Sequence, residues 1–293
     1  MSARTPDSTQ TLLPDDFPPG LLEIPSAPEQ LFVRGKLPPE GTRCLAVVGS
    51  RALSSYGREA CEMLIAGLAG YPISIISGLA LGADACAHKA ALRAGLHTVA
   101  VLGSGLADSV IGPPSNFGLA KEILESGGAL VSEYPPEEIS YPGNFPARNR
   151  IVVGLSRAVL LVEAGERSGT LITARLAGEY NRDLLCVPHR IGDRNSAGIH
   201  QFMRLGATPV SEPAHILEAL GFSTDQGDEA RIVSIPELSD TEAQLYALLE
   251  EPRPRDELIR ASGLSAGAAL TTLVTLELRG LIKEEFGAWR RRT

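Results

Sequence analysis

Short runs of apolar residues alternate with longer stretches of helical spacing from Arg43 onward. The apolar runs predict strands, and stretches with apolar residues every three to four positions predict amphipathic helices. Buried strands that alternate with helices pair in parallel and carry helices on both faces of one sheet. The chain therefore predicts a doubly wound, mostly parallel α/β domain. The expected strands are 45–48, 73–77, 98–102, 129–132, 158–162 and 184–187, and the expected helices are 56–68, 84–94, 119–125, 172–179 and 199–205.

The chain divides into four segments by composition. Residues 1–40 are rich in proline and weakly periodic, which favours an extended lead-in that packs on a domain rather than forming one. Residues 41–222 form the predicted α/β domain, and 223–237 are polar and turn-rich, as in a linker. Residues 238–293 begin with a capping-box spacing and continue as three short helices and a small hairpin. That order is typical of a winged-helix domain.

Composition limits the classes of function open to this chain. With 44% hydrophobic and 21% charged residues, the 293-residue chain has the make-up of a globular protein with its own core. A net charge of −8 argues against a general polyanion binder, but it leaves room for a local basic cleft. The four cysteines are isolated, which favours buried thiols in a reducing cytoplasm. No stretch resembles a signal peptide or a membrane span, so we expect a cytoplasmic protein without membrane contact.

Small residues follow the predicted strands at the places where ligands bind in doubly wound folds. Such turns come after four strands, at 49–51, 77–82, 103–105 and 165–170. Free backbone N–H groups at helix starts attract anions, so an acidic protein can hold phosphates with few cationic side chains. The alternative is that these glycines only form tight turns. None of the loops has the G-x-G-x-x-G or G-x-x-x-x-G-K-[ST] pattern, which weakens a dinucleotide or P-loop interpretation.

The segment 143–150 carries the most distinctive side chains. Phe145 precedes a proline in a glycine-led loop that neither helical nor strand periodicity buries, and Arg148 and Arg150 follow it. An exposed ring stacks on bases, while guanidinium groups bind phosphates through two parallel hydrogen bonds. Together with Arg51 after the first strand, these residues predict a nucleic-acid site, in which we expect no core role for Arg51 or Arg148. The alternative is a lid whose Phe145 packs on the core.

The sequence lacks the usual parts of a catalytic or metal site. No serine or cysteine lies in an elbow motif near a histidine, and no group of residues has metal-ligand spacing. His88 falls on a helical pattern and is expected to be a partly buried helix residue. Asp84 is expected to cap a helix, and Glu133 and Glu163 to pair with cleft arginines. We therefore expect neither enzymatic activity nor a cofactor.

Several motifs, in order along the chain, resemble the DNA-processing protein A family, also called DprA or Smf. They include A-V-V-G-S-R at 46–51, F-P-A-R-N-R-I-V at 145–152 and E-R-S-G-T-L-I-T-A at 166–174. The similarity runs from about Pro18 to Gly221 and implies a Rossmann-like domain, with a C-terminal winged helix after it. It also implies a protein that binds single-stranded DNA, protects it, forms a homodimer and loads the RecA recombinase in natural transformation and recombination.

The resemblance also implies which residues contact DNA. By their motif positions, the DNA-contacting side chains are Arg51, Phe145, Arg148 and Arg150. Hydroxyl and backbone N–H donors to phosphate are implied at Ser50, Ser77, Gly78, Ser168, Gly169 and Thr170. The chain departs from the family after the third strand, where Gly-Ser-Gly-Leu-Ala at 103–107 lacks the usual cysteine and aspartate.

A second interpretation is a nucleotide-processing enzyme of the lysine-decarboxylase-like Rossmann group. Such an enzyme places a glycine–threonine loop at a helix start and pairs an arginine with a glutamate near the sugar. Arg148 with Glu163 or Glu166 fits that requirement, but the Pro-Gly-Gly loop signature is absent. The tail after Pro252 is locally basic, and its winged helix serves either DNA or a protein partner.

Overall fold

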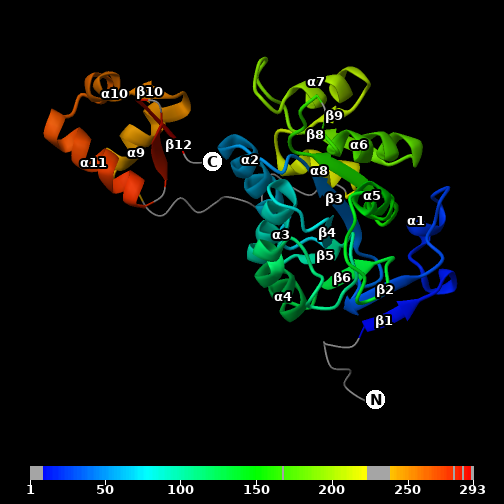
Figure 1. Ribbon diagram of the computed structural model, residues 1–293. Coiled ribbons are helices and arrows are strands. Elements are labelled where there is room, and N and C mark those ends of the chain that lie inside the picture. The colour runs from blue at the N-terminus through cyan, green and yellow to red at the C-terminus, as the bar shows by residue number, and fades with distance from the viewer. Residues whose placement is uncertain (1–8, 167, 223–237, 280, 286, 292–293) are drawn as a thin grey trace. The chain divides into compact units, whose positions relative to one another are not determined.

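The computed structural model describes residues 9–166, 168–222, 238–279, 281–285 and 287–291 (Figure 1). The chain divides into two compact units, Met1–Thr224 and Asp225–Thr293. The first eight residues and the predicted linker 223–237 lie outside the described residues, so the linker stays a prediction.

Unit 1 is built on one large sheet. Its described strands lie in the order β1-β2-β6-β5-β4-β3-β7-β8-β9. All pairs from β6 to β9 are parallel, whereas β2 pairs antiparallel with β1 and β6. This arrangement confirms the predicted doubly wound, mostly parallel α/β fold. The strands are β1 (Thr9–Leu12), β2 (Leu31–Gly35), β3 (Arg43–Val48), β4 (Ile73–Ser77), β5 (His97–Val101), β6 (Ala129–Ser132), β7 (Ala158–Leu161), β8 (Asp183–Cys186) and β9 (Thr208–Pro209).

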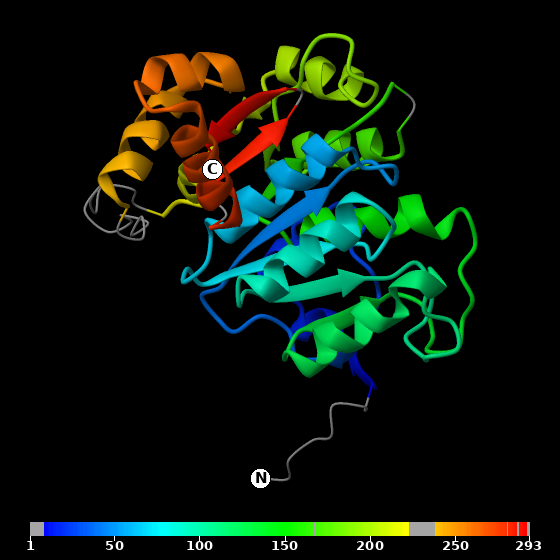
Figure 2. The same cartoon turned by 90° about the vertical axis from the view of Figure 1, so that its left-hand side faces the viewer.

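Helices cover both faces of this sheet (Figure 1). One face carries α1 (Pro19–Leu22), α5 (Asn144–Gly154), α6 (Thr170–Glu179) and α7 (Ala197–Arg204). The other carries α2 (Ser55–Ala66), α3 (Ala83–Arg93), α4 (Phe117–Glu125) and α8 (Pro213–Ala219). Figure 2 turns the face with α2, α3 and α4 toward the viewer. Because the strands between the two layers are buried on both sides, they are apolar without alternation.

The proline-rich N-terminal segment contributes two strands that the sequence analysis did not predict. In β2, Leu31 and Val33 point inward and are 1% and 4% exposed, while their neighbours are partly exposed. β2 pairs with β6, which supplies the hydrogen bonds that an isolated segment of this length lacks. A five-residue run among prolines gives too little periodicity to identify a strand from sequence.

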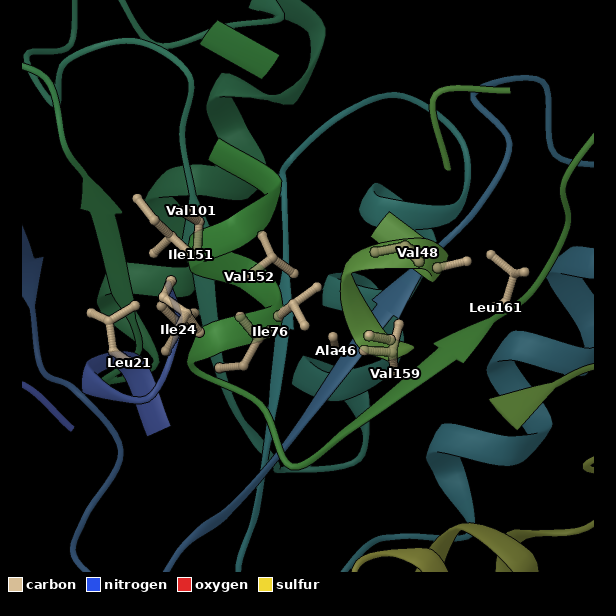
Figure 3. Close-up of a cluster of buried hydrophobic side chains, with 14 of the residues drawn as sticks. Leu21, Ile24, Ala46, Val48, Ile76, Val101, Ile151, Val152, Val159 and Leu161 are labelled. Atoms are coloured by element: carbon tan, nitrogen blue, oxygen red, sulfur yellow. The ribbon is translucent and has the colours of Figure 1, made fainter. Parts of the chain in front are cut away.

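The segment 143–150 is mostly helical, whereas the sequence analysis placed it in a loop. It leads into α5, and Pro146 lies in the first turn, where a helix N–H has no intrahelical partner to lose. The next turn buries Ile151 and Val152, and Figure 3 shows both side chains packed near Ile76 of β4. The buried apolar residues of α5 stand only in its second half, so periodicity did not reveal its beginning.

Unit 2 has three helices followed by a hairpin, as predicted. They are α9 (Asp240–Ala247), α10 (Arg255–Ser262) and α11 (Ala266–Leu278), with the antiparallel strands β10 (Arg253–Pro254), β12 (Ala288–Arg291) and β11 (Ile282–Glu285). The predicted capping box of Ser239 and Glu242 is present at the start of α9. Leu245, Leu273 and Trp289 belong to a core that lies within this unit.

Within the described ranges, no single helix has the length and apolar character needed to cross a membrane. The segments Arg255–Ser262 and Ala266–Glu277 meet these criteria only together, as a pair bent by 115°.

Candidate functional site

The carboxyl ends of the parallel strands meet at one edge of the unit 1 sheet. The chain moves from β3 to β4, β5 and β6 on one side and returns to β7 on the other, so β3 and β7 flank the topological switch point. A cleft of about 720 Å³ opens there between the loop after β3 and the starts of α5 and α6. A smaller pocket of about 260 Å³ shares Arg51, Ala80, Phe145 and Arg148 with it.

This edge brings together most of the residues predicted for the site. The larger cleft is lined by seven of them, Ser50, Arg51, Phe145, Arg148, Ser168, Gly169 and Thr170. Gly78 lines the smaller pocket. Ser77 and Arg150 line neither the cleft nor the pocket.

Among the described residues that line the cleft, Arg51 is the exposed cation. It follows β3, and its guanidinium carbon lies 5.5 Å from the centre of the Phe145 ring, within cation–π range. The ring is half-buried, because it packs against the backbone at Gly103, where a Cβ would lie only 3.0 Å from it. Phe145 is therefore neither a fully exposed ring nor a core residue. It forms a wall that the cleft and the pocket share.

Arg148 has a core role that the sequence analysis did not expect. Its side chain starts on α5, is 5% exposed, and donates from Nη1 to the carbonyls of Gly78, at 2.8 Å, and Val101. The guanidinium thus joins the ends of β4 and β5. Gly78 must be glycine here, because a Cβ would lie 2.4 Å from two guanidinium nitrogens. An arginine placed by a helix over open strand ends satisfies carbonyls that lack strand partners.

Asp84 balances this buried charge from the first turn of α3. Its Oδ2 accepts from the N–H groups of Gly78, at 3.1 Å, and Ala80, at 3.3 Å, so it caps the turn before the helix. Burial raises the pKa of Asp84, although Arg148 and these donors favour its charged form. Burial lowers the pKa of Arg148, and Asp84 opposes that change. The pair stabilises the turn that follows β4.

Two other predicted contacts are directed away from the cleft. Arg150 forms a two-point ion pair with Glu133, at 2.9 and 2.5 Å, and its Nε donates to Ser26 O at 2.7 Å. Glu133 pairs with an arginine as predicted, but this arginine does not line the cleft, and the pair uses the donors that were expected to bind phosphate. Ser77 is fully buried, and its hydroxyl donates to Val47 O at 2.6 Å. Its expected role as a phosphate donor is therefore not supported.

The described residues that lead into α6 offer backbone and hydroxyl groups to the cleft. Thr170 donates from its hydroxyl to Gly49 O at 3.1 Å, and the Ser168 hydroxyl donates to Thr170 Oγ1 at 2.8 Å. These bonds fix the start of α6 against the loop after β3. Gly169 is exposed at the N-terminus of this ten-residue helix, where the helix dipole favours an anion.

Glu163 organises the loop that carries Arg51, a role that the sequence analysis missed. It was expected to pair with an arginine, but its carboxylate, 1% exposed, accepts from the N–H and hydroxyl of Ser54. Asn195 donates to Glu163 at 2.8 Å and to Ala52 O at 3.0 Å. A Cβ at Gly57 would lie 2.4 Å from the carboxylate, so the glycine makes room for it. Gly57 was therefore the sequence signal for the role of Glu163, since glycine leaves room for the carboxylate at this position.

His189 lies beside Glu163. Its Nε2 is 3.7 Å from Glu163 Oε1, which is an ion-pair separation, and Nδ1 donates to Val187 O at 2.8 Å. Burial would lower the pKa of His189, but Glu163 and the carbonyl outweigh it and raise the pKa. Burial would likewise raise the pKa of Glu163, but donors from His189, Ser54 and Asn195 lower it to about 2.

The variant Glu163→Gln is expected to change how stability depends on pH. In the wild type, the stabilisation from Glu163 is present above its unfolded pKa of about 4.3 and is lost as pH falls toward 2. The His189 contribution is present below its unfolded pKa of about 6.5 and is lost as pH rises through the raised folded value. The amide removes both effects and should cost about 1–2 kcal/mol near pH 6.

Thermal melts of wild type and Glu163→Gln between pH 4 and 9 measure this difference. The gap in melting temperature should narrow above neutral pH as His189 loses its proton. A gap that stays constant across the range would exclude the ion pair as its source. Glu166→Gln is the control, since that side chain is exposed.

The described residues offer little for catalysis. No group of three or more His, Cys, Asp or Glu side chains among them is arranged to hold a metal ion. His88 lies on α3, as predicted, but it is fully rather than partly buried, and burial together with Arg148 lowers its pKa to about 3. Arg148 and Glu163, which the enzyme interpretation pairs, have different partners in the described part of the chain.

Basic residues of unit 2 mostly stabilise their own unit. Arg279 pairs with Glu242 at 2.7 Å, and Arg253 pairs with Glu257 at 3.1 Å. Arg291 lies over the Tyr246 ring and donates to its carbonyl at 3.0 Å. Helix α11 contains no lysine or arginine in its sequence. Arg292, which the sequence analysis included in the basic tail, lies outside the described residues.

Comparison with known proteins places this chain in a family. Residues 8–221 match the family profile described as DNA recombination-mediator protein A. The chain belongs to this family, DprA. Residues 230–287 match the DprA winged helix domain, so unit 2 is the winged helix that its element order predicts. The resemblance drawn from the motifs is confirmed.

Individual DprA relatives cover most of the chain. Protein Smf of Escherichia coli is 41% identical over 289 residues, covering 96% of this chain and 77% of its own length. DprA of Streptococcus pneumoniae is 41% identical over 212 residues, covering 72% and 74%. Its crystal structure matches with a TM-score of 0.68 at 39% identity, covering 74% of this chain and 75% of that one. A Helicobacter pylori structure, described for the single-stranded DNA binding mode of that DprA, has a TM-score of 0.64 at 28% identity, covering 72% and 95%.

Proposed function

We propose that this DprA is a non-enzymatic recombination mediator that binds single-stranded DNA in the cleft at the switch point of its sheet. The observation that carries the proposal is the exposed Arg51 beside the half-buried ring of Phe145. A cation and a ring face within 5.5 Å of each other match a phosphate and its neighbouring base. The single-stranded DNA binding mode described for the Helicobacter pylori DprA supports the same ligand class.

Each part of the cleft has a distinct role in this proposal. Arg51 binds a phosphate, and Phe145 stacks on the adjoining base. The exposed backbone at Gly169 and the neighbouring hydroxyls of Ser50 and Thr170 line the path of the next phosphate. Arg148 acts as a positioning residue, since its bonds to Gly78 and Val101 hold the cleft floor.

Single-stranded DNA is expected to bind at least about tenfold more tightly than duplex of the same length, because Phe145 needs an unpaired base face. The described residues that line the cleft include few cations, so the slope of log K against log salt should be no steeper than about −2. Fluorescence anisotropy of a labelled 20-nucleotide strand and its duplex, between 50 and 300 mM salt, measures both quantities. Equal affinities for the two forms at moderate salt contradict the proposal.

We further propose that the protein acts as a homodimer in the cytoplasm, protects incoming DNA during natural transformation and loads RecA onto it. Membership in a family of recombination mediators supports this role. The test follows RecA filament growth on strands coated with single-strand-binding protein. Added wild-type protein should shorten the lag, and Arg51→Ala should not. The homodimer is tested by sedimentation of the protein without DNA, which should give twice the mass of one chain.

The proposed absence of catalysis is tested separately. The protein is incubated with nucleoside monophosphates, and release of the free base is followed by chromatography. No base release is expected, because the buried Arg148 and Glu163 are held by protein groups. Base release that Glu163→Gln abolishes would favour the nucleotide-processing alternative.

A further inference from the structure

The loop after β8 continues the edge that carries Arg51. Asn195 in this loop donates to Ala52 O at 3.0 Å, and its own carbonyl accepts from Ala164 N at 2.9 Å. The loop is therefore fixed beside the loops that follow β3 and β7. Since β3, β7 and β8 are adjacent and parallel, its residues extend the edge away from Phe145.

Tyr56 presents an aromatic ring on this extension. It lies in the first turn of α2 and is 48% exposed, although its hydroxyl donates to Pro188 O at 2.6 Å. The ring also meets the His189 ring edge-on, with centroids 5.0 Å apart. These two contacts hold the ring in one orientation while nearly half of it faces solvent. A fixed, exposed ring loses little conformational entropy when a base stacks on it.

Two exposed arginines lie in the same loop. Arg190 begins a turn in which its N–H donates to Asp193 Oδ2 at 3.2 Å, and Asp193 N–H donates back to Arg190 O at 3.3 Å. Gly192 has φ +90°, which the turn requires. Arg194 follows it. Neither guanidinium forms an ion pair with a described residue. Asp193 is the acidic residue of this loop, and Glu163 and Glu166 are those of the loop after β7.

We propose that Tyr56, Arg190 and Arg194 form a second nucleotide-binding subsite on the same DNA strand as the Arg51–Phe145 cleft. This inference rests on the proposed function. Phe145 stands near the end of β5, and four strand spacings of about 4.8 Å separate β5 from β8, or about 19 Å. Bases at the B-form spacing of 3.4 Å cover that distance in about six nucleotides. Tyr56 stacks on a base, and the arginines bind flanking phosphates.

The cationic part is tested with the full-length double variant Arg190→Ala/Arg194→Ala and a labelled 20-nucleotide thymidine strand. We expect a loss of affinity of roughly tenfold near 100 mM salt, and a salt slope reduced in magnitude by about 1.4, or 0.7 for each lost phosphate contact. The matched control is Arg157→Ala/Arg204→Ala. Arg157 precedes β7 and Arg204 ends α7, so both exposed arginines lie at the opposite edge of the sheet.

The stacking part is tested with Tyr56→Ala and Tyr56→Phe. Tyr56→Ala should weaken binding roughly tenfold, whereas Tyr56→Phe keeps the ring, loses only the bond to Pro188, and should stay within about twofold of wild type. A purely structural role would affect both variants. Tyr56→Trp gives a direct readout, since its emission should be quenched when the strand is added. The wild type, with the single buried Trp289, serves as the blank.

The outcomes separate this inference from the proposed function. If wild type binds the strand and Arg51→Ala weakens binding, while Arg190→Ala/Arg194→Ala matches its control, the second subsite is disproved and the cleft stands. If wild type does not bind single strands, both proposals fail. Tyr56→Phe as weak as Tyr56→Ala likewise rejects the stacking role.

Discussion

The variant Arg148→Ala is expected to lower the free energy of unfolding of unit 1 by about 3–5 kcal/mol, the usual cost of removing one partner of a buried charged network. The side chain is 5% exposed and satisfies the carbonyls of Gly78 and Val101 at the ends of two neighbouring strands. Its loss also leaves the buried Asp84 without its nearest counter-charge. For a domain of this size the melting temperature should fall by about 6–20 °C. A thermal melt followed by circular dichroism measures this change.

Two further variants distinguish the core role from a DNA contact. Arg148→Lys should recover little stability, since the lysine side chain ends one bond short of the Nη1 position from which both carbonyls are bound. Gly78→Ala should destabilise as well, because its Cβ would lie 2.4 Å from the guanidinium. If Arg148→Ala melts like wild type and loses only DNA affinity, Arg148 is a contact residue and the structural assignment is wrong.

The variant Arg51→Ala is expected to weaken single-stranded DNA binding by about 1.5–3 kcal/mol, or roughly 10- to 150-fold, without destabilising the protein. Arg51 is exposed, and its described side-chain contact is the face of Phe145. Removing an exposed guanidinium changes the stability of the protein little. Losing a charge-assisted phosphate contact, in contrast, strongly weakens the affinity for DNA. Anisotropy titrations give the affinity, and thermal melts give the stability.

Controls for Arg51 separate geometry from charge. Arg51→Lys keeps the charge but lacks the planar donor pair, so it should recover only part of the affinity. Arg204→Ala removes one exposed arginine from the opposite edge of the sheet and should leave binding near wild type. An Arg51→Ala variant that binds as tightly as Arg204→Ala would refute the assignment of the cleft.

The two variants concern arginines for which the sequence analysis expected one shared role and the structure shows different roles. Arg51, Arg148 and Arg150 all come from arginine-containing motifs, and the sequence analysis gave them one role. In the structure, Arg148 braces strand ends and Arg150 pairs with Glu133, so only Arg51 has its guanidinium exposed at the cleft. In the proposed site, binding therefore depends on a few contacts that a rigid floor positions, which suits an acidic protein.

The sequence by itself determined the fold class, the winged helix and the sheet edge where the site lies. Buried parallel strands are apolar on both faces, so β3, β4 and β5 stand out as short apolar runs between amphipathic helices. The capping box at Ser239 and Glu242 marks a helix start through purely local bonds. Small residues after strands indicate the ligand edge, because chain direction alone brings the carboxyl ends together.

Only the tertiary structure decided which of the predicted side chains face the cleft. The strand β2 forms because β6 offers a free edge a hundred residues later, and α5 holds its first turn because its second half is buried. Ser77 turns its hydroxyl to Val47, and Glu163 meets Ser54 and Asn195 rather than an arginine. These partners are distant in sequence, and a buried polar group takes whichever donor or acceptor packing brings to it, so residue type alone could not identify them.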